Sequence, residues 1–150
     1  MRELDVAKIP YEVLTYQVDE QNLGAEYVAQ KINRDIAMVF KTLALLSDKK
    51  EFIMACIPGN QELDLKKLAK AAGCKNVEML ELKLLLSYTG YIRGGCSPIG
   101  IKKRHRIFIH QSAMDLPQIV VSAGQRGLQL ELTPQALRDY LHMSVADIVF

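Results

Sequence analysis

The residues best suited to hold a ligand lie in one short stretch, Tyr91–Gly100, whose sequence is YIRGGCSPIG. Its glycines leave backbone N–H groups bare, so these groups can approach a ligand with no Cβ in the way. The run Lys102-Lys103-Arg104 follows directly and would attract an anionic substrate. The stretch therefore predicts a binding loop with a basic flank. The alternative is an ordinary turn beside a solvated charged segment.

A second candidate is Lys41, which interrupts the apolar run Ile36–Leu46. Such a run is typical of a buried strand, where a lysine is costly unless its ammonium finds a partner or reaches a cleft. One interpretation places the amine in a polar pocket, where it would orient or stabilise a substrate oxygen. The other lets the lysine stem carry the amine past the sheet edge to water and gives it no further role.

A protein nucleophile with its own base is not evident in the sequence. His105, His110 and His142 have no paired carboxylate at a telling spacing, and surface or strand-end positions are expected for them. Cysteine and histidine clusters at zinc-ligand spacing are missing, as are phosphate-loop and dinucleotide fingerprints, so neither a metal nor a cofactor is predicted. Cys96 is interpreted as a packing residue. A hydrolase built from these residues would need a substrate that carries its own nucleophile.

The composition predicts one domain over residues 1–150, with 49% apolar and 24% charged residues serving a core and a solvated surface. No signal-type or bilayer-spanning segment is seen, and the three cysteines are odd in number and far apart. A cytoplasmic location without membrane contact is therefore expected. The net charge of +2 argues against a general nucleic-acid binder. Two basic clusters, one around Lys66 and Lys70, instead suit a protein that holds phosphates near a terminal nucleotide.

Hydrophobic periodicity and turn residues predict interleaved helices and strands rather than a regular βαβ repeat. The last helix is expected to open at Thr133, with Pro134 in its first turn. The other helices are expected over Met1–Lys8, Gly24–Ile32, Asp64–Ala72 and Val77–Ser87, and strands over Tyr11–Tyr16, Met38–Leu46, Phe52–Ile57, Ile107–Ile109, Ile119–Ser122 and Leu128–Leu130. The fold class expected from this order is α+β.

Several short motifs occur in an order that resembles the YbaK and prolyl-tRNA synthetase editing-domain family. They are Phe40-Lys41-Thr42-Leu43, the segment Leu63–Gly73, the loop Gly94–Gly100 with its basic run, Val121–Leu128 and Ala146-Asp147-Ile148. The resemblance runs from Ile9 to the C-terminus. It implies an α+β fold with a mixed, largely antiparallel, barrel-like sheet and flanking helices.

The resemblance also implies an activity. The protein would be a deacylase that removes a wrong amino acid from transfer RNA, acting as a hydrolase or a lyase. In the branch most similar to this chain the substrate is Cys-tRNA(Pro), with Cys-tRNA(Cys) as a further candidate, and the cysteine thiol attacks its own carbonyl. The protein would then supply orientation and electrostatic stabilisation. The implied partners are the tRNA acceptor end and prolyl-tRNA synthetase in a transient complex. No oligomeric state is predicted.

Site residues carried over from the resemblance fall into three groups. Lys41, Gly94 and Gly95 would be catalytic, the lysine contacting terminal phosphate or ribose oxygens and the glycines offering N–H donors. The substrate-binding group comprises Tyr16, Ser97, Pro98, Gly100 and Ser122, and the tRNA-binding group comprises Lys102, Lys103 and Arg104. For Tyr16 and Ser122 the alternative role is ordinary packing within a strand.

The chain departs from the family pattern at four positions: Leu14, where the family often has histidine, Ala123, where it often has glycine, and Gln129 and His110, where it often has acidic residues. Three other functions stay open, the first two of them because of these departures. One is a deacylase for another small amino acid such as alanine. Another is a non-catalytic module that binds tRNA or a synthetase. The last is an unrelated α+β protein whose glycine loop holds a phosphate.

Overall fold

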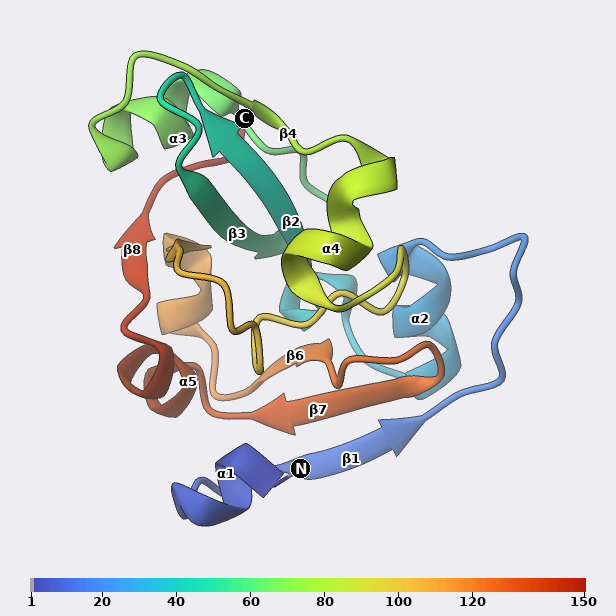
Figure 1. Ribbon diagram of the computed structural model, residues 1–150. Helices are drawn as coiled ribbons and strands as arrows, with labels where there is room; N and C mark the ends of the chain where they lie inside the picture. The colour runs from blue at the N-terminus through green and yellow to red at the C-terminus, as the bar shows by residue number, and fades with distance from the viewer. Residues whose placement is uncertain (1) are drawn as a thin grey trace.

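The computed structural model describes residues 2–150 and contains two β-sheets (Figure 1). The smaller sheet has the order β1-β7-β6, and all of its pairings are antiparallel. Its strands are β1 (Glu12–Thr15), β6 (Ile119–Ser122) and β7 (Leu128–Leu132). The larger sheet has the order β4-β2-β3-β5-β8. Its strands are β2 (Phe40–Ser47), β3 (Phe52–Pro58), β4 (Val77–Met79), β5 (Arg106–His110) and β8 (Ser144–Ala146).

The larger sheet is mixed, because β2 pairs antiparallel with β3 and β4 whereas β5 pairs parallel with β3 and with β8. A parallel bridge between Val39 and Val120 joins the two sheets at the start of β2. The α+β class and the largely antiparallel pairing are therefore confirmed. The barrel-like closure is not: across residues 2–150 the strands form two separate sheets that meet at this bridge.

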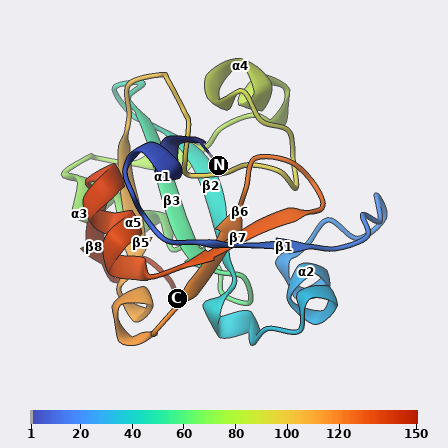
Figure 2. The same cartoon turned by 90° about the horizontal axis from the view of Figure 1, so that it is seen from below.

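Burial explains why β3 lies at the centre of the larger sheet. All seven of its residues are buried, as expected for an apolar strand with a layer on each face. One layer is the smaller sheet, whose Val121 and Leu130 share a core with Met54 and Cys56 of β3. The opposite layer is α3 (Leu65–Ala72), which packs on the alternate residues of β3. In Figure 2 the smaller sheet lies in front of β2 and β3, with α5 (Pro134–Leu141) at one end and α2 (Ala25–Ile32) at the other.

Local signals explain the helix ends that the sequence predicts. The Asp64 carboxylate accepts hydrogen bonds from the N–H groups of Lys66 and Lys67 at the start of α3, and Gly73 ends this helix with a φ of +70°. Thr133 occupies the N-cap position of α5, although its side chain forms no capping hydrogen bond. The first helix, α1, spans Arg2–Val6. No helix among residues 2–150 is long and apolar enough to cross a membrane.

Two elements differ from the expectation. The helix predicted over Val77–Ser87 is wrong: the segment begins as β4 and continues into the short helices η2 (Leu82–Leu84) and α4 (Leu85–Thr89). The open edge of β2 accounts for this difference, because β4 pairs with Leu45–Ser47 and the Asp48 carboxylate accepts hydrogen bonds from the N–H groups just before β4. Tertiary pairing has overridden local propensity here. Strand β8 was not expected, since three mostly exposed residues carry no alternation to recognise. The remaining short helices are η1 (Ile36–Met38) and η3 (Gln111–Asp115).

Candidate active site

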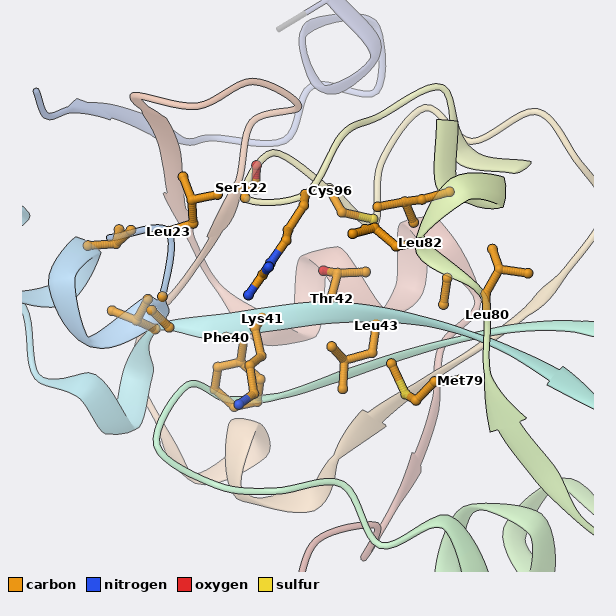
Figure 3. Close-up of a pocket in the computed structure, with 18 of the residues that line it drawn as sticks. Leu23, Phe40, Lys41, Thr42, Leu43, Met79, Leu80, Leu82, Cys96 and Ser122 are labelled. Carbon is orange, nitrogen blue, oxygen red and sulfur yellow. The ribbon is translucent and has the colours of Figure 1, made fainter. Parts of the chain in front are cut away.

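A cavity of about 390 Å³ opens where the start of β2 meets the glycine loop (Figure 3). This volume lies within the range of about 300–1,000 Å³ that is usual for small-molecule sites. Its walls come from α2, β2, the β4–α4 segment, the glycine loop and the facing strands β6 and β7. The lining residues with polar or charged side chains are Lys41, Thr42, Arg93, Cys96, Ser122 and Gln129. Segments far apart in the sequence therefore share one site.

Lys41 lies in this cavity wall as the second residue of β2, opposite Ile57 of β3. Side chains alternate along a strand, and Figure 3 shows Lys41 and Leu43 leaving β2 on one side and Thr42 on the other. The ammonium of Lys41 donates to the carbonyl oxygen of Gly59 at 3.2 Å. Lys41 is thus half-buried at the edge of the cavity, with its ammonium bonded to the chain itself. Contact between this ammonium and a substrate stays a prediction.

The glycine loop has a tight turn at its entrance. The N–H of Gly95 donates to the carbonyl of Ile92 at 2.9 Å, and Gly94 between them has a φ of +85° that favours glycine. Gly94 and Cys96 both line the cavity, and their N–H groups donate to no atom of residues 2–150. These two amides are therefore the loop donors available to a ligand, whereas the amide of Gly95 is already used within the turn.

The wall opposite β2 is formed by a pair of residues from neighbouring strands. Ser122 of β6 faces Gln129 of β7 in the antiparallel register, and both are buried and line the cavity. The hydroxyl oxygen of Ser122 accepts the N–H of Gly124 at 3.2 Å, which leaves its own hydrogen free to donate. The glutamine presents a neutral amide where the family often carries an acid. This wall can therefore hydrogen-bond a substrate oxygen without adding negative charge.

The cavity lacks a protein nucleophile paired with a base. Burial raises the pKa of the Cys96 thiol to about 11, so this thiol is protonated at neutral pH. Neither a histidine nor a carboxylate belongs to the lining that residues 2–150 provide. The hydroxyls of Thr42 and Ser122 consequently have no base beside them to remove a proton. No group of three or more potential metal-ligating side chains forms within the described chain either. What the site offers is positive charge and hydrogen-bond donors.

Several residues predicted for the substrate site lie elsewhere. Pro98, Gly100 and Lys102 line a second cavity of about 480 Å³, together with residues from α1, β5 and α5. Ser97 is fully buried, and its hydroxyl oxygen accepts the N–H of Ile99. Tyr16 packs edge to face on Tyr27, with ring centroids 6.4 Å apart, and does not line the first cavity. Substrate contact by these residues stays a prediction.

The basic run remains on the surface. Lys102, Lys103 and Arg104 are all exposed, and the ammonium of Lys103 lies 4.7 Å from the centre of the Tyr88 ring. This arrangement gives a cationic rim beside the glycine loop, on the side of the second cavity. Contact between these three residues and tRNA is compatible with their exposure and stays a prediction.

Sequence reasoning missed three contributors to the site. Arg93 lines the cavity, and it was identifiable because it is the one charged residue within Tyr91–Gly100. Thr42 lines the cavity as well, and alternation along β2 places its side chain on the face opposite to that of Lys41. Gly59 supplies the oxygen that holds Lys41, and only the β2–β3 register brings it there. No sequence signal could have identified this last contact.

The comparisons with known proteins identify the family. Residues 19–140 match the model of the aminoacyl-tRNA editing domain, and the chain belongs to that family. The chain is 47% identical over 148 residues, 99% of its length and 90% of the relative's, to the Enterococcus faecalis protein named "Putative Cys-tRNA(Pro)/Cys-tRNA(Cys) deacylase EbsC".

Solved structures agree on the fold. The crystal structure of the hypothetical protein APE2540 has a TM-score of 0.91 at 19% identity, covering 99% of this chain and 97% of that one. A crystal structure described as that of "a putative trans-editing enzyme for prolyl tRNA synthetase" has a TM-score of 0.82, also at 19% identity, covering 93% and 87%. At these identities the likeness shows the shared fold. It does not bear on the substrate.

Proposed function

We propose that this protein is an aminoacyl-tRNA deacylase that cleaves cysteine from Cys-tRNA(Pro) and also accepts Cys-tRNA(Cys). The editing-domain family and the name of its Enterococcus faecalis relative support the reaction class and the cysteine substrate. We further propose that residues 1–150 act as one editing domain in the cytoplasm, where charged tRNA is used. A transient complex with prolyl-tRNA synthetase belongs to the same proposal.

One observation carries the mechanism: the cavity combines cations and amide donors with no activated protein nucleophile. Lys41 and Arg93 are its charged lining residues, and the thiol of Cys96 is held protonated by burial. An ester bound there has to be cleaved by a group that it brings itself or by water. A cysteinyl ester brings a thiol two bonds from its own α-carbon, so intramolecular attack is the reaction that needs least from the protein.

The reaction balances without a protein base. The cysteine sulfur forms a bond to its own carbonyl carbon, the bond from that carbon to the ribose oxygen breaks, and the thiol proton passes through solvent to the departing hydroxyl. Water then opens the cyclic thioester to free cysteine. Negative charge develops on the carbonyl oxygen during the attack, and the N–H groups of Gly94 and Cys96 are the donors we assign to it.

Lys41 and Ser122 complete the assignment. The ammonium, held at 3.2 Å by the Gly59 carbonyl, would bind phosphate or ribose oxygens of the terminal adenosine. The Ser122 hydroxyl, already accepting from the Gly124 amide, would donate to a ribose or carbonyl oxygen on the opposite wall. Loss of one preorganised donor to developing charge typically lowers the rate about 100- to 1,000-fold.

The test is release of radiolabelled cysteine from Cys-tRNA(Pro) by the purified protein. We expect turnover by the natural chain and a loss of at least tenfold in Lys41→Ala, since a charge-assisted hydrogen bond is worth about 1.5–3 kcal/mol. Lys75→Ala is the matched control, because this exposed lysine lines neither cavity. Circular dichroism checks that both variants fold. Full activity in Lys41→Ala would remove the lysine from the mechanism.

Parallel substrates separate the alternatives. Ala-tRNA(Pro) lacks the thiol, so its cleavage at the rate of Cys-tRNA(Pro) would contradict self-cleavage and favour a deacylase for small amino acids. Cleavage of Cys-tRNA(Cys) tests the second cysteine substrate. Tight binding of Cys-tRNA(Pro) without release of cysteine would instead identify a non-catalytic tRNA-binding module.

A further inference from the structure

The first cavity, between the start of β2 and the glycine loop, has an unbalanced charge. Lys41 and Arg93 line it, whereas no aspartate or glutamate belongs to the lining formed by residues 2–150. The family's frequent acid is replaced by the neutral Gln129, which is buried in the same wall. A site with two cations and no carboxylate favours an anionic ligand group.

The two cations differ in what they already contact. The ammonium of Lys41 donates to the Gly59 carbonyl, which satisfies part of its bonding capacity. The guanidinium of Arg93 forms no hydrogen bond or ion pair with any residue of the described chain 2–150, and the residue is exposed at the cavity. Its five N–H donors are therefore available to a ligand.

The backbone of Arg93 is nevertheless held in place. Its carbonyl accepts a hydrogen bond from the Nε of Arg126 at 2.8 Å, and the turn closed by the Gly95 N–H to the Ile92 carbonyl surrounds it. The neighbouring Gly94 is closely packed, because an ideal Cβ added to it would lie 3.3 Å from side-chain atoms of Leu23 and of Arg126. A cation on a fixed backbone at the edge of a pocket loses less entropy on binding than one on a mobile loop.

We propose that Arg93 binds the 5′-phosphate of the terminal nucleotide, and that it positions the aminoacyl ester without taking part in bond cleavage. This inference rests on the proposed function. The aminoacyl part of the substrate carries an ammonium and no anion, so the phosphate is the nearest negative group for an arginine beside the cavity. The guanidinium matches a phosphate with two parallel N–H donors, which a lysine cannot do.

Binding of unreactive nucleotides tests the inference without any turnover. By titration calorimetry or NMR shifts we expect the natural chain to bind adenosine 5′-monophosphate about tenfold more tightly than adenosine, the value of one charge-assisted contact. In Arg93→Gln the two ligands should bind equally, and Arg93→Lys should keep part of the preference. Arg138→Gln is the matched control, because this arginine on α5 lines neither cavity. Equal or undetectable binding of both ligands to the natural chain overturns the inference.

Hydrolysis of minimal substrates then separates positioning from chemistry. We compare 3′-cysteinyl adenosine with and without its 5′-phosphate. Arg93→Gln should raise KM about tenfold for the phosphorylated ester, leave kcat within twofold, and have no effect on the ester that lacks phosphate. With tRNA, the slope of log KM against log salt should fall by about 0.7, the value for one phosphate on a single strand.

The outcomes distinguish this inference from the proposed function. An equal loss on both esters would show that Arg93 acts on the acyl group or the loop, and it overturns the inference. A natural chain that cleaves no ester but prefers adenosine 5′-monophosphate through Arg93 would refute the deacylase and support the phosphate site. Because Arg93 is exposed and its guanidinium forms no hydrogen bond or ion pair with a described residue, the substitution should leave the thermal midpoint unchanged, which excludes misfolding as an explanation.

Discussion

Gly95 lies directly against the backbone of Gln125: a Cβ added to the glycine would be 3.2 Å from the Cα of Gln125 and 3.3 Å from the N of Arg126. Two loops thirty residues apart in sequence are thereby packed main chain to main chain beside the cavity. The first loop carries the amides of Gly94 and Cys96, and the second follows directly after Ser122. Close contact between them sets the width of the site.

Gly95→Ala should therefore destabilise the protein and impair activity. The added methyl group meets backbone atoms, which cannot rotate away, so the loops must separate by a few tenths of an ångström. We expect a loss of about 1–3 kcal/mol in the free energy of unfolding, measured by urea titration. Gly24→Ala is the control, because nothing lies within 4 Å of its added Cβ and its φ of −74° suits alanine. Equal stability of the two variants would contradict the packing argument.

Gly59→Ala should act on Lys41 through the fold. An ideal Cβ on Gly59 would lie 2.4 Å from the Cβ of Ala25, so β3 and α2 must move apart and the carbonyl that holds the lysine must shift. We expect a destabilisation of about 1–3 kcal/mol and a fall in kcat/KM. Adding Ala25→Gly removes the closest clash and should recover part of both, because the Val39 carbonyl oxygen and the Ile36 side chain still lie 3.0 Å from the added Cβ. No recovery in the double variant would show that the clash is not the cause.

The lysine motif and the glycine loop were recognisable from residue types, because a lysine in an apolar run and a cluster of glycines are both unusual locally. Their meeting in one cavity was not, since it depends on the β2–β3 register and on the bridge between Val39 and Val120. The same limit explains the helix wrongly expected over Val77–Ser87. Its first residues pair with an open strand edge that no local pattern reveals.

The predicted binding loop is divided between two cavities. The sequence predicts one ligand-binding segment over Gly94–Gly100, whereas Gly94 and Cys96 line the first cavity and Pro98 and Gly100 line the second one. Ser97 between them is fully buried and bonds to the loop itself. A chain that turns this tightly presents neighbouring residues to opposite sides. Glycine content predicts such a turn but not the side to which each residue is presented.

Cys96→Ala should retain activity within about threefold, although a cysteine beside a scissile ester could be taken for a nucleophile. With a thiol pKa of about 11, only about one molecule in a thousand carries the thiolate at pH 8. Truncating the partly buried side chain should cost about 1 kcal/mol of stability. Ester cleavage assays and urea titration measure the two effects. A thousandfold loss of turnover in a folded variant would identify Cys96 as the nucleophile after all.

Alkylation gives an independent measure of the same thiol. Iodoacetamide should modify Cys96 and Cys56 slowly in the native protein, because burial raises their pKa values to about 11 and about 12. Unfolding in urea should make both react at the rate of a free thiol. Mass spectrometry of tryptic peptides identifies the modified residue, and rapid labelling of Cys96 in the native state would contradict its burial.

His110 should make stability depend on pH between about 7 and 5. Burial lowers the pKa of this imidazole, with the Lys67 ammonium acting in the same direction and the Asp147 carboxylate, at 3.8 Å, opposing them. The unfolded chain then binds a proton more readily than the native one, so stability is lost as the pH falls below about 6.5.

His110→Asn isolates this effect. The amide oxygen can still accept the N–H of Ile148, as the Nδ1 of His110 does at 3.3 Å, but it does not titrate. Urea titrations at pH 7 and pH 5 should show a smaller decrease in stability for the variant than for the natural chain. The Asp147 carboxylate does not interfere, because its hydrogen bond from Lys67 holds its pKa below the usual range of about 4. An unchanged decrease in the variant would assign the pH dependence to another group.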